Sequence, residues 1–220
     1  MKSMQKPKIG ISLRVVDAPN YDEKRDALSH DWPTLLENLG LNPIYIPNTL
    51  KHVDEFFSEM SLNGLILSGG DDIGENLDRD ETENLLLKLA IEKQIPIFGV
   101  CRGMQLINNY FGGNISVSNS NDHISKNHDV DITNQNFSSL FNTNKITVNS
   151  YHRNTIQMNQ IGNDLNPFAI SKSDKTIEGF FHTRFPIIGV MWHPERSKPF
   201  NDSIMLAKIF RSKIFWTENH

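Results

Sequence analysis

Cysteine is nearly absent from this chain: among its 220 residues, Cys101 is the one cysteine. A single thiol excludes an internal disulfide and is typical of a reducing compartment. The first ten residues lack the apolar core of a signal peptide, and no apolar run approaches the length that crosses a bilayer. We therefore expect a cytoplasmic protein that has no membrane partner.

An excess of basic residues is also missing. The chain has 22 lysine and arginine residues against 26 acidic residues, and its net charge is -4. Because the basic residues are scattered along the sequence, they do not indicate a nucleic-acid-binding surface. No internal repeat of roughly 20 to 50 residues is visible. A hydrophobic content of 38% is enough for one well-filled α/β domain, which we expect to span residues 1–220. The Asn- and Ser-rich stretch from Ser116 to Asn144 is expected to form long loops.

In the first half, short apolar strands alternate with amphipathic helices, which predicts a mostly parallel sheet with right-handed crossovers. The polar segment Asp17 to Arg25 is expected to be a loop, and Asp80 with Glu83 has the spacing of a capping box. The expected strands are 8–13, 43–46, 64–67 and 95–100, and the expected helices are 31–40, 53–60, 85–91 and 106–111.

After Gly112-Gly113 the pattern changes to strands joined by loops, so the C-terminal half is expected to be partly antiparallel. The sequence thus predicts a three-layer α/β/α, flavodoxin-like domain. Its binding crevice should lie at the carboxyl ends of the parallel strands. The later strands are expected at 130–133, 145–149, 168–171, 177–181 and 187–192, followed by a closing helix from Asp202 to Phe215.

The segment Gly99 to Gln105 joins an apolar strand to a helix and contains the lone cysteine. At such an elbow the nucleophile takes a strained conformation, and small neighbours such as Gly99 and Gly103 let the chains approach. The helix N-terminus favours a thiolate at Cys101. A buried, inert thiol is the alternative for an isolated cysteine, and the glycine-flanked elbow favours the nucleophile.

His193 lies at the exit of an apolar strand, and Glu195 follows two positions later across a proline. In an extended segment these two side chains can face the same way, so Glu195 can orient the imidazole while His193 reaches the sulfur. Alone, a His-Pro-Glu turn is more often an exposed loop. Together with an elbow cysteine it predicts a nucleophile, a base and an orienting carboxylate.

The segment Ser68 to Asp71 places consecutive glycines at the end of a buried strand. Backbone N–H groups there can turn toward a developing oxyanion, and our candidates are the amides of Gly70 and Arg102. A flexible turn or a phosphate-binding nest is the alternative.

These motifs, together with Val148 to His152, resemble the class I glutamine amidotransferase superfamily, and most of all its free-standing γ-glutamyl hydrolases, such as the γ-glutamyl-γ-aminobutyrate hydrolases. The resemblance spans residues 9–210. It implies thioester chemistry without a cofactor or metal. It also implies a Cys101-His193-Glu195 triad, an oxyanion hole at Gly70 and Arg102, and γ-glutamyl recognition by Gln105, Asn149, Ser150, Tyr151 and His152.

Arg153 follows His152 where a glutamine is common in that branch, and the chain is shorter than usual for it. We include Arg153 among the substrate-binding candidates. Arg14, Arg25, Arg79 and Arg153 are candidates for a clamp on an anionic leaving group, with solvated surface arginines as the alternative for each. The segment Tyr21 to Asp26 resembles the short hydrolases found with bacterial capsule-sugar genes, one type of which cleaves γ-glutamyl-CDP-amidate to glutamate and cytidine diphosphoramidate.

His123 and His128, with Asp122 and Asp129 nearby, suggest a metal site, but we expect solvated loop histidines because no cysteine accompanies them. Two other classes of function stay open. One is a glutaminase subunit that delivers ammonia to a separate synthase, and the other is a non-catalytic redox sensor or chaperone. The expected ligand is a small γ-glutamyl molecule, and a homodimer is compatible with the sequence.

Overall fold

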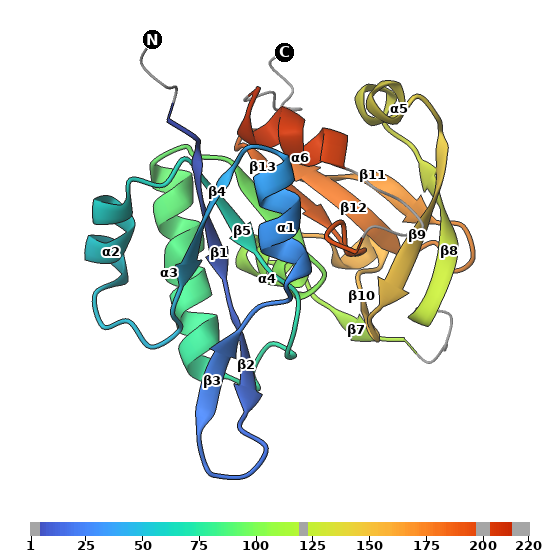
Figure 1. Ribbon diagram of the computed structural model, residues 1–220. Coiled ribbons are helices and arrows are strands. Elements are labelled where there is room, and N and C mark those ends of the chain that lie inside the picture. The colour runs from blue at the N-terminus through green and yellow to red at the C-terminus, as the bar shows by residue number, and fades with distance from the viewer. Residues whose placement is uncertain (1–4, 119–122, 197–202, 213–220) are drawn as a thin grey trace.

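The computed structural model describes residues 5–118, 123–196 and 203–212. Nine of the described strands form one sheet in the order β4-β1-β5-β6-β13-β12-β11-β8-β9, with helices packed on both sides (Figure 1). The strands are β1 (Lys8–Ser12), β2 (Arg14–Asp17), β3 (Lys24–Ala27), β4 (Asn42–Ile46), β5 (Gly64–Leu67), β6 (Ile97–Val100), β7 (Ser116–Val117), β8 (Ile124–Ile132), β9 (Lys145–Tyr151), β10 (Asn154–Thr155), β11 (Leu165–Ser171), β12 (Ile177–His182) and β13 (Ile187–Val190). The helices are α1 (Asp31–Asn38), α2 (Val53–Met60), α3 (Leu77–Glu92), α4 (Arg102–Tyr110), α5 (Gln135–Phe141) and α6 (Ser203–Phe210), with a 3-10 turn at Met158–Gln160.

The sheet changes character at β13. Strands β4, β1, β5, β6 and β13 pair in parallel, whereas the pairs from β13 through β12, β11 and β8 to β9 are antiparallel. The expected α/β fold, with an antiparallel C-terminal part, is confirmed. Antiparallel strands need only short connections, which explains why the second half of the chain contains fewer helices.

The two faces of the sheet bury separate cores because successive side chains of a strand point to opposite faces. In β5, Ile66 packs into the core beneath α1, α5 and α6, while Leu65 and Leu67 pack into the core beneath α2, α3 and α4. Trp32 of α1 and Leu86 of α3 are buried at the centres of these layers. The three-layer arrangement follows from this alternation.

Three expectations for local structure are wrong in whole or in part. The expected loop at 17–25 is confirmed over 18–23, but its two ends belong to the strands of the hairpin β2–β3. The side chains of these strands are mostly exposed, so hydrophobic periodicity does not indicate them. The stretch from Ser116 to Asn144 contains β8 and α5 rather than long loops alone. In α5, the Asn134 side chain accepts hydrogen bonds from the N–H groups of Asn136 and Phe137, a cap that starts a short polar helix.

The third error concerns the start of α3. The helix begins at Leu77 behind Asn76, and no side chain forms a capping hydrogen bond there. Asp80 and Glu83 lie inside the helix and turn toward buried arginines instead. The predicted closing helix is present as α6, and the parts of that prediction at 202 and 213–215 lie outside the described residues.

Parallel pairing positions three loops together. β5, β6 and β13 are neighbours with Leu67 opposite Gly99 and Gly99 opposite Gly189, so the segments after all three strands emerge at one edge. These segments contain Ser68 to Asp71, Cys101 and His193 to Glu195. No described helix has the length and apolar character needed to cross a membrane.

Candidate active site

Cys101 sits at a strained junction between β6 and α4. Its φ of 50° and ψ of -106° lie where side-chain-bearing residues are rare, and the Cys101 N–H donates to the carbonyl of Val190 at 2.8 Å. Gly103 permits this close packing because a Cβ there would lie 2.0 Å from the carbonyl oxygen of Leu67. The side chain of Cys101 is 7% exposed. The predicted elbow is therefore present, with the sulfur at the edge of a cavity.

His193 and Glu195 form the predicted pair. Nδ1 of His193 lies 2.8 Å from Oε1 of Glu195, both side chains are buried, and the side chain of Cys101 is close enough to raise the pKa of His193. Gly69 lies between the ring and the elbow, since a Cβ on it would be 2.8 Å from Cε1 of His193 and 3.6 Å from Cβ of Cys101. Because Nδ1 of His193 hydrogen-bonds the Glu195 carboxylate, Nε2 is the ring nitrogen that can interact with the Cys101 sulfur.

The pKa of His193 is raised from 6.5 to about 9. Burial acts to lower this pKa, but the hydrogen bonds and charges of Cys101 and Glu195 outweigh it. A protonated imidazole next to the sulfur favours the thiolate form of cysteine. The raised pKa therefore keeps a proton on His193 at neutral pH, where it can be donated to a leaving group.

Asn149 holds the histidine loop. Its Oδ1 accepts from the N–H of His193 at 2.8 Å, and its Nδ2 donates to the carbonyls of His193 and Arg196. The side chain is 1% exposed. The resemblance suggested Asn149 as a substrate contact. Its hydrogen bonds instead hold the backbone around His193 in place, a role that no local sequence pattern indicated.

Behind the glycine loop lies a buried cluster of charges, which we call the Arg79–Arg102 network: Asp71, Arg79, Asp80, Glu83 and Arg102. Arg79 bonds Asp71 and Glu83 at 3.1 Å each and donates to the carbonyls of Ser68 and Gly69. Arg102 bonds Glu83 and Asp80. The network therefore ties the glycine loop to the start of α4.

The network corrects one expected role. From the sequence, Arg79 was a candidate for an anion clamp, with a solvated surface arginine as the alternative. Both interpretations are wrong, because the Arg79 side chain is fully buried and already forms ion pairs with Asp71 and Glu83. Arg25 is paired with Glu23 and Tyr21 on the exposed hairpin. Sequence patterns could not find the network because Asp71 and Arg102 reach the three members on α3 only through the tertiary fold.

A cavity of about 260 Å³ opens beside Cys101. Its wall contains four of the predicted substrate contacts. Two further polar residues, Asp72 and Asn154, also line it, and Nδ2 of Asn154 donates a hydrogen bond to Oδ1 of Asp72 at 2.9 Å. The predicted contacts that line it are Gln105, Tyr151, His152 and Arg153, together with Gly70 and Arg102 of the predicted oxyanion hole. Ser150 is buried elsewhere, with its hydroxyl bonded to the carbonyl of His123 at 2.8 Å.

A second, smaller cavity of about 40 Å³ lies on the other side of the glycine loop. It is bordered by His193 and by two arginines, Arg14 of β2 and Arg196. A Cβ on Gly70 would lie 2.9 Å from Cβ of Arg14, so Arg14 covers this loop. The Arg196 guanidinium stacks 4.0 Å from the ring centroid of Tyr151. Two positive side chains thus flank the reacting groups.

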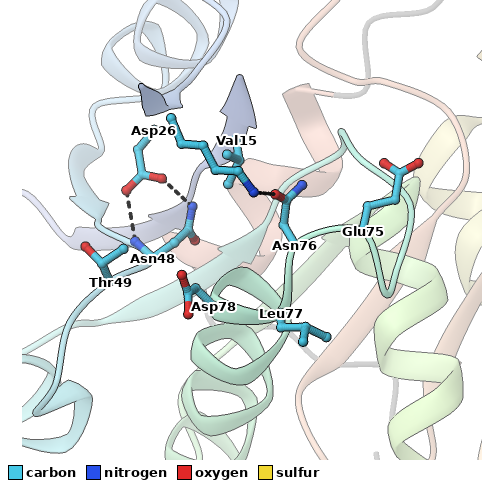
Figure 2. A pocket seen from close by; sticks show the side chains of 9 residues that line it. Val15, Asp26, Asn48, Thr49, Glu75, Asn76, Leu77 and Asp78 are labelled. Carbon is cyan, nitrogen blue, oxygen red and sulfur yellow. Dashed lines mark hydrogen bonds between the residues drawn. The ribbon is translucent and has the colours of Figure 1, made fainter. Parts of the chain in front are cut away.

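The hairpin that carries Arg14 borders a further cavity of about 400 Å³, shown in Figure 2. There Asp26 accepts hydrogen bonds from the backbone and side chain of Asn48, and Lys24 reaches Asn76 at 3.4 Å (Figure 2). The cavity shares no lining residue with the two at Cys101. We assign it an anchoring role for the hairpin and not a share in the reaction site.

The histidines predicted to be solvated are buried. His123 is 0% exposed and the side chain of His128 is 8% exposed, and both face Glu178 of β12. His152 joins them from the cavity wall, and burial lowers its pKa to about 4. Asp122 lies outside the described residues. The expectation failed because the burial comes from the pairing of β8 with β9 and from β12, which are remote in sequence.

Comparisons with known proteins identify the family of this chain. A profile of the Peptidase C26 family matches residues 7–195. The chain is 34% identical over 209 residues to the γ-glutamyl-CDP-amidate hydrolase of Campylobacter jejuni, covering 92% of this chain and 96% of that protein. It is 28% identical over 160 residues to a subunit of the glutamine-hydrolysing GMP synthase of Methanocaldococcus jannaschii, covering 73% of this chain and 78% of that protein.

Solved structures of low sequence identity show the same fold. A glutamine amidotransferase from Thermotoga maritima superposes with a TM-score of 0.65 at 15% identity, covering 96% of this chain and 84% of that one. PurLQS from the same organism gives a TM-score of 0.66 at 20% identity, covering 93% and 98%. The chain therefore belongs to the Peptidase C26 family of class I glutamine amidotransferase-like hydrolases.

Proposed function

We propose that this protein hydrolyses a γ-glutamyl amide through a thioester on Cys101. The observation that carries the proposal is the buried His193–Glu195 hydrogen bond beside Cys101, whose side chain acts on the pKa of His193 from the strained elbow. A nucleophile, a base in contact with it and a carboxylate that orients the base form a complete set for acyl transfer.

In the first half-reaction, the Cys101 thiolate attacks the γ-carbonyl carbon. The negative charge passes to the carbonyl oxygen, which the backbone amides of Gly70 and Arg102 stabilise. The C–N bond then breaks, and the proton on Nε2 of His193 goes to the leaving nitrogen. The products of this step are an amine and a γ-glutamyl thioester.

In the second half-reaction, water attacks the thioester while neutral His193 takes its proton. The C–S bond breaks, glutamate leaves, and the thiolate–imidazolium pair is restored. Glu195 keeps the imidazole oriented through both half-reactions and stabilises each imidazolium state. Atoms and charges therefore balance with no cofactor in the reaction.

The cavity beside Cys101 is suited to the glutamyl group. Asp72 supplies a carboxylate for the α-ammonium group and Arg153 a guanidinium for the α-carboxylate, and Gln105 lines the same cavity. Asp72 was not singled out from the sequence, because one acidic residue after a glycine loop has no distinguishing pattern. These contacts bind the part of the substrate that all γ-glutamyl amides share.

For the leaving group we propose a phosphoramidate such as that of γ-glutamyl-CDP-amidate, which would assign the protein to capsule polysaccharide biosynthesis. Two observations support this choice: Arg14 and Arg196 flank the second cavity, and the Campylobacter relative carries that name at 34% identity over nearly its full length. Guanidinium groups match the geometry of phosphate oxygens. A neutral or cationic amine would gain nothing from these charges.

The test compares the purified chain on γ-glutamyl-CDP-amidate, γ-glutamyl-γ-aminobutyrate and L-glutamine, with released glutamate measured by mass spectrometry. We expect the phosphoramidate to have the highest kcat/KM and Cys101→Ser to lose at least about 10³-fold in kcat. A glutamine-mimicking diazo-ketone should label Cys101 and inactivate the protein. Labelling at another residue, or full activity of Cys101→Ser, would contradict the mechanism.

A second candidate is a glutaminase subunit that passes ammonia to a synthase. The similarity to the GMP synthase component of Methanocaldococcus favours it. The two candidates separate in the same assay: negligible turnover of all three substrates by the isolated chain, restored by adding a synthase, would support the glutaminase role and exclude the free-standing hydrolase.

A further inference from the structure

A compact group of metal-ligand side chains lies behind the cavity wall: His123, His152 and Glu178. His123 precedes β8, His152 follows β9 and Glu178 is on β12, all in the antiparallel part of the sheet (Figure 1). One nitrogen or oxygen atom from each lies within 4.8 Å of the others. The three residues are 0%, 5% and 0% exposed. No step of the proposed reaction uses this group.

Hydrogen bonds on the outside of the group determine which nitrogens face inward. Nε2 of His123 lies 2.7 Å from Oδ2 of Asp174, and Nδ1 of His152 lies 2.9 Å from the carbonyl of Asn154. Both partners accept, so these ring nitrogens carry the protons. The opposite nitrogens therefore point lone pairs inward, as in the carboxylate–histidine arrangements that surround bound metals.

The inward atoms have no hydrogen-bond donor among the described residues. Nδ1 of His123 and Nε2 of His152 lie 3.7 and 3.8 Å from Oε1 of Glu178, and all three are buried without a hydrogen-bond partner. Buried acceptors that face one another are costly unless a cation or a proton lies between them. Ligands of a tetrahedral zinc ion about 2.1 Å from the metal lie roughly 3.4 Å apart. The two separations from Glu178 are 3.7 and 3.8 Å, and all three atoms lie within 4.8 Å of one another, so a small inward shift of the side chains would complete the site.

We propose that His123, His152 and Glu178 bind one divalent transition-metal ion, of which zinc fits the two imidazoles and one carboxylate best. His128 lies 3.4 Å from the other oxygen of Glu178, and Asp174 orients His123 through a hydrogen bond. The ion would join the start of β8, the end of β9 and β12. Such an ion would be structural, because its ligands come from three segments that are far apart in the sequence.

The ion has a consequence for the substrate cavity, and this consequence alone rests on the proposed function. His152 lines the cavity between Tyr151 and Arg153, so its ligation would fix the wall that contacts the glutamyl group. Removal of the metal should therefore raise KM more than it lowers kcat.

The test measures metal binding without substrate, so its outcome is separate from that of the proposed function. It uses the full chain with Cys101→Ser, which removes the thiolate as a competing ligand. After treatment with a chelator, zinc is titrated by calorimetry and cobalt by visible absorption. We expect one ion per chain, the absorption bands of tetrahedral cobalt, and a raised Tm with zinc.

Three variants locate the ion. His123→Asn should abolish stoichiometric binding, Asp174→Asn should weaken it about 10- to 100-fold, and His52→Asn, an exposed histidine at the start of α2, should leave it unchanged. If His123→Asn fails to fold, Asp174→Asn decides alone, because its side chain is partly exposed on a turn. No binding of either metal, or equal binding by the Asp174 and His52 variants, would overturn the proposal. Binding that requires Cys101 would do the same.

Discussion

At the scale of single residues, the distinctive feature is the protonation of His193. Its pKa is raised to about 9 although the ring is buried, because Cys101 and Glu195 favour the charged form. A buried histidine without such partners would be neutral. His182 provides the comparison within this chain, since burial against Phe111 and Phe185 lowers its pKa to about 4.

The raised pKa of His193 predicts an alkaline limit for the reaction. Above about pH 9 the imidazole loses the proton that the leaving nitrogen must receive, so kcat/KM should fall about tenfold for each further pH unit. Because Glu195 contributes to the raised pKa, Glu195→Gln should move this limit to lower pH as well as reduce kcat. Stopped assays between pH 6 and 10.5 test both, and an unchanged limit in Glu195→Gln would refute the assigned cause.

The leaving-group contact predicts a substrate-specific effect. Arg14→Gln should raise KM for γ-glutamyl-CDP-amidate about tenfold and leave KM for L-glutamine within about twofold, since glutamine releases only ammonia. Arg25→Gln is the matched control on the same hairpin, because Arg25 is paired away from both cavities at Cys101. Equal losses on both substrates would mean that Arg14 serves the fold of the loop and not the phosphate.

At the scale of elements, the glycine loop after β5 must lie against the histidine. Gly69→Ala would place a methyl group 2.8 Å from Cε1 of His193, so the ring or the loop must shift. A displacement of this size typically costs about 10²-fold in kcat while the protein stays folded. Gly74→Ala is the control, because a Cβ there meets nothing within 4 Å and its φ of 95° costs only stability. Comparable kcat in the two variants would contradict this account.

The Arg79–Arg102 network makes α3 a second support of the elbow. Glu83→Gln would leave two buried guanidinium groups short of a negative partner, and we expect a loss of about 3 to 5 kcal/mol in the free energy of unfolding. Glu81→Gln, on an exposed side of the same helix, should change it by less than about 0.5 kcal/mol. Urea unfolding monitored by fluorescence measures both, and equal stabilities would show that the buried charges are dispensable.

At the scale of the whole molecule, acid stability should depend on His182. The unfolded chain takes up a proton near pH 6.5, and the folded chain does so only near pH 4. The unfolded state therefore binds more protons in this window, so stability falls as the pH decreases from 6.5 to 4. His182→Asn should reduce this pH-dependent loss by roughly 1 to 3 kcal/mol, whereas His30→Asn, an exposed histidine, should not. Parallel stability curves for all three proteins would contradict the prediction.

Local sequence was sufficient for much of the architecture. Strands β4, β5 and β6 and helices α1 and α2 follow from apolar runs and helical spacing, because their burial in a three-layer fold imposes those periods on the sequence. The strand-to-helix elbow at Cys101 was predictable for a similar reason: Gly103 must lack a side chain where the helix passes the carbonyl of Leu67. The hairpin β2–β3 and helix α5 were missed because backbone pairing and a side-chain cap, and not a buried face, hold them.

The sequence by itself determined the family, the elbow cysteine, and the His193–Glu195 pair, because each of these is encoded within a few consecutive residues. Only the tertiary structure decided how the remaining polar residues are used. In the folded chain Arg79 is buried against Asp71 and Glu83, and Asn149 hydrogen-bonds the histidine loop. His123, His152 and Glu178 come together from the start of β8, the end of β9 and β12. These groupings depend on which strands are neighbours in the sheet, and strand order is set by long-range packing that no local pattern records.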